Sequence, residues 1–370
     1  MADTILITGG AGFIGRRVAQ AVLARGHRVR ILDSLIDQVH GGAPPEGLAA
    51  EAEFVTADVR DEAAVKRALA GVDKVVHLAA EVGVGQSMYA VDRYVSVNDL
   101  GTAILFQQLI DARVRRVVVA SSMSIYGEGL YRTVDGSVVE DAHRTGRPAA
   151  AGSWDPLDRD GRPLVPLPTP EWKRPSLASV YALTKYVQER LTLTLAPAYG
   201  MEGVALRLFN VYGPGQALSN PYTGVLAIFA SRLLNGERPL VFEDGLQRRD
   251  FVHVDDVAEA FALALESPSA PGHVFNVGSG RDRSILEIGT ALAAAMGRPE
   301  LTPETVGKAR IGDIRHCFCD GRLAQEMLGF QARRDFGEGL ADLADWVAGQ
   351  TAQDRVAEAK AELEKRGLVA

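Results

Sequence analysis

Short apolar segments alternate with amphipathic segments through the first third of the chain. The apolar segments have the length and the β-branched content of buried strands, and the segments between them carry apolar residues at helical spacing. Strands joined by helices of this length predict right-handed crossovers and a doubly wound parallel sheet, which is an α/β fold. The segments are, in chain order, TILITGG, RRVAQAVLARG, HRVRILDS, EAEFVTADVRD, EAAVKRALAG, VDKVVHLAAE and RRVVVASS.

The pattern changes after residue 127. Residues 128–178 are rich in proline and glycine and predict an irregular insertion, of the kind that forms a lid or a mobile segment. After it we expect a long helix from Val180, a strand over EGVALRLFNVYG and a helix through GVLAIFASRLLNG. We therefore expect residues 1–208 to form the parallel-sheet domain, and residues 209–347 to form a smaller α/β region interleaved with it.

The last residues, 348–370, predict a helical tail. Val356, Ala359 and Leu363 fall on one helical stripe with charged residues elsewhere, and Gly367 suits a C-terminal cap. We find no internal repeat in the sequence.

The composition is that of a folded protein, with 47% apolar and 24% charged residues in 370. The formal net charge of −7, without a basic tract, argues against a nucleic acid or an anionic membrane as the main partner. Cys317 and Cys319 are too few for a disulfide framework or a four-cysteine zinc site, so we expect reduced thiols and no metal. The first strand starts almost at the amino terminus and no apolar run reaches membrane-spanning length, which predicts a cytoplasmic protein.

A glycine-rich turn follows the first predicted strand and opens the first predicted helix. Such a turn lets the backbone approach a pyrophosphate at the amino terminus of the helix, as in dinucleotide-binding folds of the Rossmann type. Asp33 ends the next strand, where a carboxylate accepts hydrogen bonds from a ribose diol and repels a 2′-phosphate. NAD is therefore favoured over NADP, and a purely structural turn with a capping Asp33 is the alternative. The residues of the turn are Gly9, Gly12, Phe13, Ile14 and Gly15.

Two further segments carry candidate chemistry. Small hydroxyl residues follow the apolar strand in VVVASSMSIYGEG, at the end of a strand where ligands bind in open parallel sheets; an ordinary strand exit is the alternative. Tyr181 and Lys185 are spaced to share one face of a helix. A lysine cation beside a phenol lowers the pKa of the phenol toward that of a general base for a sugar hydroxyl. A solvated helix face is the alternative for this pair.

The sequence resembles the short-chain dehydrogenase/reductase superfamily, because five motifs occur in the order that defines it. They are the glycine-rich turn, HLAA after the fourth strand, VNDLGT on the next helix, the serine-bearing strand and Y-x-x-x-K. The resemblance is to the extended branch of NAD-dependent epimerases and dehydratases that act on nucleotide-linked sugars, and it covers about Thr4 to Trp346. It implies a Rossmann-type fold, NAD as cofactor and a catalytic trio of Ser122, Tyr181 and Lys185. It also implies cofactor contacts by Ala79, Ala80, Asn98, Tyr181 and Lys185. Asp58 and Val59, in ADVRD after the third strand, are expected near an adenine, and a surface Asp in a loop is the alternative.

The same resemblance implies where a nucleotide-diphosphate sugar would bind. Ser124 is expected to line the sugar pocket and Asn210, in RLFNVYGPGQ, to lie near the diphosphate. Arg249, in QRRDFVHVDDVA, and Arg310, in RIGDIR, are expected to hold phosphate oxygens through paired, charge-assisted hydrogen bonds. Phe242, in PLVFEDG, is expected near the nucleobase.

Four other polar residues of this half of the chain are expected outside the chemistry. Arg248 and Arg315 are expected at the surface, where they would serve solubility. His253 and Asp255 are expected in strand packing and helix capping.

Met123 and Ser124 discriminate between the reactions of this branch. The 4,6-dehydratases carry Asp-Glu directly after the residue that matches Ser122, and hexuronate decarboxylases keep a Glu at the position of Ser124. Neither acidic residue is present here, which favours 4-epimerisation, a reversible oxidation at C4 that inverts the sugar.

Within this branch the sequence resembles the dTDP-L-rhamnose 4-epimerase group of the UDP-glucose 4-epimerase-like proteins. The resemblance rests on SSMSIYGEG, on the insertion with AGSWDPL and PLPTPE, and on the EKRGLV ending, although the cysteine pairs of some relatives are missing from the insertion. Epimerisation of a UDP-hexuronate and other dehydratase or decarboxylase chemistry stay open, as does a non-catalytic dinucleotide-binding regulator. The resemblance also implies a homodimer through residues 97–113 and 181–200, which are apolar over a broad face.

Overall fold

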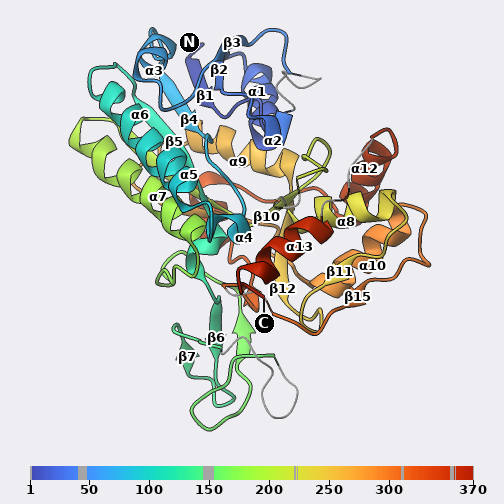
Figure 1. Ribbon diagram of the computed structural model, residues 1–370. Helices are drawn as coiled ribbons and strands as arrows, with labels where there is room; N and C mark the ends of the chain where they lie inside the picture. The colour runs from blue at the N-terminus through green and yellow to red at the C-terminus, as the bar shows by residue number, and fades with distance from the viewer. Residues whose placement is uncertain are drawn as a thin grey trace.

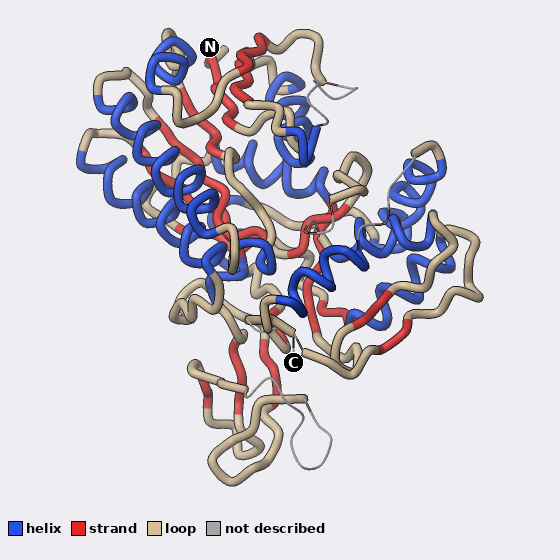
Figure 2. The backbone as a smooth tube through the Cα atoms, in the orientation of Figure 1, coloured by secondary structure: helices blue, strands red, loops and turns tan. Residues whose placement is uncertain are grey.

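The computed structural model describes residues 2–40, 48–144, 154–220, 222, 224–309, 312–350, 354 and 356–369. Its main element is a seven-stranded sheet in the order β13-β9-β5-β4-β1-β2-β3, in which every neighbouring pair is parallel (Figures 1 and 2). The strands are β1 (Thr4–Thr8), β2 (Arg28–Asp33), β3 (Glu53–Thr56), β4 (Lys74–His77), β5 (Arg116–Ser122), β9 (Glu202–Leu208) and β13 (Val274–Val277). The predicted doubly wound α/β sheet is confirmed.

Helices cover both faces of this sheet (Figure 1). Ile5 and Ile7 of β1 pack in one core with α1 (Phe13–Ala24) and α9 (Val254–Glu266). Leu6 packs on the opposite face, in a core with α3 (Glu62–Ala68) and α6 (Gly101–Ile110). Successive strand residues point to opposite faces and both faces are covered, so the centre of β1 is a run of consecutive apolar residues rather than an alternating pattern. The long helix α7 (Val180–Ala198) lies beside α6.

A second, smaller region forms around a sheet in which β10 (Asn210–Tyr212), β12 (Arg248–His253) and β14 (Asp282–Ser284) are neighbours and β16 (His316–Cys317) pairs with β12. Its core includes Phe229 of α8, Leu292 of α10 and Leu343 of α12. These helices span Val225–Leu234, Ile285–Ala295 and Phe336–Ala348, and the short strands β11 (Leu240–Val241) and β15 (Glu304–Thr305) pair beside them.

The strand predicted over EGVALRLFNVYG is two strands in the structure. β9 belongs to the large sheet and β10 to the smaller one, with Phe209 between them. The chain then returns to the first region. β13 forms an edge strand of the large sheet, and α9 packs on one of its faces. Residues 209–347 are thus interleaved with the parallel-sheet domain.

The insertion is more regular than its sequence indicates. β6 (Leu130–Arg132) pairs antiparallel with β7 (Val138–Val139) and with β8 (Val165–Leu167), and this small sheet projects from the body (Figure 1). Strands of two or three residues are too short to show an alternating pattern. The remaining short elements are α2 (Asp37–His40), α4 (Val84–Ser87), α5 (Val91–Tyr94), a π-helix η1 (Val95–Leu100), a 3-10 helix η2 (Met123–Tyr126) and α11 (Arg322–Leu328).

The tail forms the predicted helix, α13 (Val356–Lys365). Gly367 has a φ of +69°, and the Leu368 N–H donates to the Leu363 carbonyl at 2.9 Å, so the predicted C-terminal cap is confirmed. Arg366 lies over the Tyr89 ring at 4.4 Å and Glu364 pairs with Lys308 at 3.1 Å. Across the described part of the chain, none of the helices combines the length and the hydropathy that crossing a membrane requires.

Candidate active site

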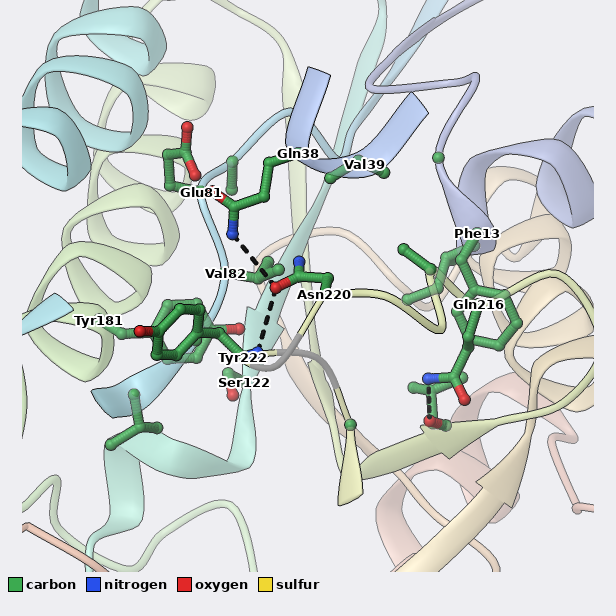
Figure 3. Close-up of a pocket in the computed structure, with 18 of the residues that line it drawn as sticks. Phe13, Gln38, Val39, Glu81, Val82, Ser122, Tyr181, Gln216, Asn220 and Tyr222 are labelled. Atoms are coloured by element: carbon green, nitrogen blue, oxygen red, sulfur yellow. Dashed lines mark hydrogen bonds between the residues drawn. The ribbon is translucent and has the colours of Figure 1, made fainter. Parts of the chain in front are cut away.

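The site is a cavity of about 1190 Å³ between the two regions. On the large sheet the cavity opens at the carboxyl ends of β1, β2, β4 and β5. The strand order reverses beside β1, because β2 and β3 lie on one side of it and β4 and β5 on the other. Ligands of open α/β sheets bind at such a switch point. In Figure 3, Ser122 and Tyr181 lie on one side of the cavity, and Phe13 and Gln216 lie on the other.

The glycine-rich turn fits a pyrophosphate. Gly9 has a φ of +69°, and a Cβ there would stand 2.8 Å from the Ala79 nitrogen. A Cβ on Gly15 would stand 2.4 Å from the Gly9 carbonyl oxygen, so both positions require glycine. Gly12 begins α1 without a side-chain cap, which leaves the first amides of the helix for an anion. All five predicted residues of the turn line the cavity: Gly9, Gly12, Phe13, Ile14 and Gly15.

Asp33 lines the cavity at the end of β2, as expected. Its carboxylate accepts hydrogen bonds from the Ala11 N–H at 3.0 Å and from the Leu35 N–H at 2.9 Å. His40 Nε2 lies 3.6 Å from the same group. Each carboxylate oxygen can accept a second hydrogen bond, so the group is held in place and still able to bind a ribose diol.

Four of the other predicted cofactor contacts line the cavity: Asp58, Val59, Ala79 and Ala80. Asp58 is also paired with Arg60 at 2.7 Å, and hydrogen bonds from Arg60 lower the pKa of this carboxyl. Asn98 does not line the cavity, and its contact with the cofactor stays a prediction. Its side chain bonds to the backbone N–H of Glu81 at 2.7 Å and to Thr184 Oγ1 at 2.9 Å, so it supports the cavity wall from behind.

Ser122 and Tyr181 meet in the cavity. Both line it, and Ser122 is close enough to lower the pKa of the Tyr181 phenol as a hydrogen-bond partner. Ser122 Oγ accepts hydrogen bonds from the Ser124 hydroxyl at 2.9 Å and from the Ser124 N–H at 3.2 Å. Both lone pairs of Ser122 Oγ are thus in use, and its single proton is left for the Tyr181 oxygen or for a ligand oxygen.

Lys185 reaches the same end of the cavity from the next turn of α7. Its ammonium donates to the Ala120 carbonyl at 2.8 Å and to Gln188 Oε1 at 2.9 Å, and burial lowers its pKa to about 7. The expected lowering of the pKa of Tyr181 by Lys185 is wrong for this arrangement. Burial raises the pKa of Tyr181, and the hydrogen bond with Ser122 lowers it in part.

Ser121 has a structural partner. Its hydroxyl donates to Glu189 at 2.7 Å, and Arg207 binds the same carboxylate through two nitrogens at 2.7 and 2.9 Å. The ion pair is buried, which ties β5 and β9 to α7. All three serines of this strand end line the cavity, and Ser121 is the one whose hydroxyl is bound to the scaffold.

On the substrate side, Asn210, Phe242 and Arg249 line the cavity. Asn210 Oδ1 is buried and has no hydrogen-bond partner among the described residues, as a ligand-binding group can be. The Arg249 guanidinium donates to the backbone carbonyls of Ile314 and Arg315, and its role toward phosphate stays a prediction. Arg310 lies outside the described residues.

Arg315 is not a surface residue, and the expectation for it is wrong. It is 1% exposed and pairs with Asp155 at 2.7 Å, Asp244 at 2.6 Å and Glu243 at 3.0 Å. These partners join the insertion to the second region, so Arg315 is a buried cross-link. His253 caps α9 by accepting the Asp255 N–H at 3.3 Å, as expected.

Sequence reasoning missed two other walls of the cavity. Gln38 donates to Asn220 Oδ1 at 3.1 Å, which links α2 to the loop after β10 across the cavity (Figure 3). The tail also lines the cavity, through the predicted stripe residues and their neighbours: Val356, Ala359, Lys360, Leu363 and Leu368. The apolar stripe of the tail was the sequence feature that could have indicated its contact with the cavity.

The described residues contain no group of three or more His, Cys, Asp or Glu side chains that could hold a metal ion. Cys317 and Cys319 are free and buried, and burial raises the pKa of both thiols.

Comparison with known proteins assigns the family. The NAD dependent epimerase/dehydratase family matches residues 5–146 and 166–278. The dTDP-L-rhamnose 4-epimerase of Burkholderia thailandensis is 37% identical over 93% of this chain and 94% of its own length. The UDP-glucose 4-epimerase of Mycolicibacterium smegmatis is 34% identical over 92% of this chain and 97% of its own.

Solved structures agree with this assignment. The UDP-glucose 4-epimerase of Thermus thermophilus, solved with NAD, is 31% identical over 94% of this chain and 100% of its own, with a TM-score of 0.72. The enzyme of that name from Thermotoga maritima, solved with UDP-glucose, is 29% identical over 93% of this chain and 98% of its own, with a TM-score of 0.74. The expected fold class, the enzyme type and NAD as cofactor are thereby confirmed. The chain belongs to the NAD dependent epimerase/dehydratase family.

Proposed function

We propose that this protein is an NAD-dependent 4-epimerase of a nucleotide-diphosphate sugar, with dTDP-L-rhamnose as the first candidate substrate. The observation that carries the reaction is the Ser122–Tyr181 pair with Lys185 at the same end of the cavity, and Met123 and Ser124 where elimination or decarboxylation would need acidic groups. Similarity to the Burkholderia thailandensis enzyme along nearly the whole chain supports dTDP-L-rhamnose.

The residues that would hold NAD are those of the glycine-rich turn, Asp33 and the backbone around Ala79. NAD, when bound, supplies the hydride acceptor for C4 of the sugar and a positively charged ring that favours the ionised form of a nearby phenol. The fit rests on the glycine-rich turn, because a Cβ at Gly9 or Gly15 would collide with backbone atoms and prevent this turn from forming.

Tyr181 is the group that exchanges a proton with the hydroxyl on C4. Its oxygen accepts the proton as C4 is oxidised and gives it back as C4 is reduced, which is general base and then general acid catalysis. Ser122 donates a hydrogen bond to the reacting oxygen, because its own acceptor sites are filled by Ser124. Inversion requires the oxidised sugar to turn and present its other face within the same cavity.

Two finer properties stay predictions. A homodimer through η1, α6 and α7 is supported by large apolar side chains on these helices, namely Val95, Leu100 and Leu183, which are 40%, 51% and 44% exposed. A cytoplasmic location is the second.

The substrate is tested by presenting dTDP-, UDP-, GDP- and CDP-linked sugars to the purified protein and following the sugar by NMR. We expect inversion at C4 of dTDP-L-rhamnose at the highest kcat/KM of the set. Faster inversion of a UDP-hexuronate or a UDP-hexose would overturn the substrate and keep the reaction class. A 4-keto-6-deoxy sugar or released carbon dioxide as the product would overturn the reaction class.

A further inference from the structure

Lys185 is held from behind by two acceptors that the protein itself provides. The Ala120 carbonyl on β5 lies 2.8 Å from its nitrogen, and Gln188 Oε1 lies 2.9 Å from it. An ammonium has three N–H groups. Two of these N–H groups are bound by Ala120 and Gln188. The positions of these two partners therefore set the direction of the third N–H group, toward the cavity that Lys185 lines.

The Gln188 side chain is completely buried and has one possible orientation. The ammonium form of Lys185 can only donate, so the amide oxygen of Gln188 faces it. The amide nitrogen then faces Thr102 Oγ1 at 2.9 Å, His77 Nε2 at 3.1 Å and the Ala79 carbonyl at 3.4 Å. These partners come from α6, from β4 and from the backbone beside the glycine-rich turn.

The groups behind Gln188 are themselves fixed. His77 is completely buried, with Nδ1 at 2.7 Å from Thr8 Oγ1 on β1 and Nε2 at 2.8 Å from Thr102 Oγ1. The Thr102 hydroxyl donates to the Asn98 carbonyl at 2.5 Å. Four elements of the scaffold therefore fix the position of the Gln188 amide: β1, β4, η1 and α6.

This support carries no charge. Burial and, to a lesser degree, the Lys185 cation together lower the pKa of His77 to about 3, so the imidazole is neutral at neutral pH. The ionisable groups of the cluster are thus Lys185 and Tyr181 on α7 and the neutral His77 on β4. A carboxylate in place of the Gln188 amide would instead stabilise the ammonium form of Lys185.

We propose that Gln188 is a positioning residue: His77 and Thr102 hold its amide, which orients the Lys185 ammonium toward the reacting end of the cavity. The inference rests on the proposed catalytic roles of Tyr181 and Lys185. Gln188 acts through Lys185, with which it shares one face of α7 at a spacing of three residues.

Two variants test the role. Gln188→Leu keeps the size of the side chain and removes the acceptor, and we expect kcat to fall about 10- to 100-fold because the ammonium is no longer aligned. KM should change much less, since Gln188 does not line the cavity. Gln188→Glu keeps an acceptor and adds a charge, and we expect it to raise the pKa of Lys185 by about 1 to 3 units.

The pKa is read without turnover, by NMR titration of protein labelled with ¹³C at lysine Cε, with the Lys185 signal identified from Lys185→Met. The same upward shift should appear in the pH profile of kcat. Thr192→Val is the matched control, because Thr192 is buried on α7 and its hydroxyl, within the described part of the chain, bonds only to the Gln188 carbonyl, at 2.9 Å. It removes a buried hydrogen bond of the same helix and should leave kcat and the titration unchanged.

Wild-type kcat in Gln188→Leu, or an unshifted Lys185 titration in Gln188→Glu, would overturn the positioning role. If Gln188→Leu does not fold, the Glu variant decides by the titration alone. Tyr181→Phe, measured in parallel, separates this inference from the proposed function. Wild-type turnover in Tyr181→Phe would overturn the proposed function. If Tyr181→Phe is inactive but the Lys185 titration is unshifted in Gln188→Glu, only the role of Gln188 is overturned.

Discussion

The Ser124 hydroxyl donates a hydrogen bond of 2.9 Å to Ser122 Oγ, and the Ser124 N–H donates a second one of 3.2 Å. The residue that stands where related reactions use an acid therefore serves here as a donor that fixes the Ser122 hydroxyl. With both of its acceptor sites filled, Ser122 presents its proton to the phenol of Tyr181.

Ser124→Ala removes the stronger of these two donors. The Ser122 hydroxyl can then rotate away from the reacting oxygen, and we expect kcat to fall about 10-fold with little change in the melting temperature. Steady-state kinetics and a thermal melt of the same preparation measure both quantities. An unchanged kcat would show that Ser122 needs no orientation by Ser124.

Asp33 predicts the choice of cofactor. Its carboxylate is fixed by the N–H groups of Ala11 and Leu35, so a 2′-phosphate at this place would meet a negative charge that cannot move away. We expect NAD to bind more tightly than NADP, and Asp33→Ala to weaken that preference. Calorimetric affinities of both cofactors for both proteins are the measurement, and equal affinities of the native protein would contradict the ribose role.

Lys185 predicts a pH dependence of stability. Burial lowers its pKa to about 7 in the folded protein, against an ordinary value of 10.5. Between these values the unfolded chain holds a proton that the folded protein has lost, so this group makes the free energy of unfolding rise with pH, by about 1.4 kcal/mol per unit. Lys185→Met lacks this contribution.

The difference in unfolding free energy, Lys185→Met minus native, should therefore decrease steadily from pH 7.5 to pH 10. Denaturant titrations of both proteins across this range measure it. Groups common to both proteins cancel in the difference, and a difference that stays constant would mean that the pKa of Lys185 is not lowered.

The exposed apolar side chains of η1 and α7 predict the oligomeric state. Leu100 and Leu183 are 51% and 44% exposed on helices that pack together, and a second copy of the chain would cover them. We expect a dimer by light scattering at micromolar concentration, and dissociation by Leu100→Glu. A monomeric native protein would rule out this interface.

The large sheet and the cofactor turn could be predicted from the sequence because their signals are local. β1 is buried at every position, with the apolar run Ile5, Leu6 and Ile7 at its centre, and is followed at once by the glycines of the turn. The insertion was predicted less well, since β7 has only two residues and β8 contains Pro166, which leaves no alternation to detect.

Long-range polar partners could not be predicted. Arg315 can be buried because its charge is paired with Asp155 and Asp244. These partners lie 160 and 71 positions before it in the sequence. The support behind Lys185 likewise joins His77 to Gln188, which are 111 positions apart. Such pairs have no periodicity in the sequence, and only the folded chain brings them together.

The transfer of hydrogen at C4 tests the central claim most directly. A 4-epimerase of this kind removes the hydrogen from C4 and restores it within one closed cavity, while Tyr181 exchanges only the proton on the C4 oxygen. Given dTDP-L-rhamnose deuterated at C4, the enzyme is predicted to yield the inverted sugar with deuterium retained at C4 and with no net consumption of NAD. Solvent hydrogen at C4 of the product, or stoichiometric reduction of NAD, would contradict the account.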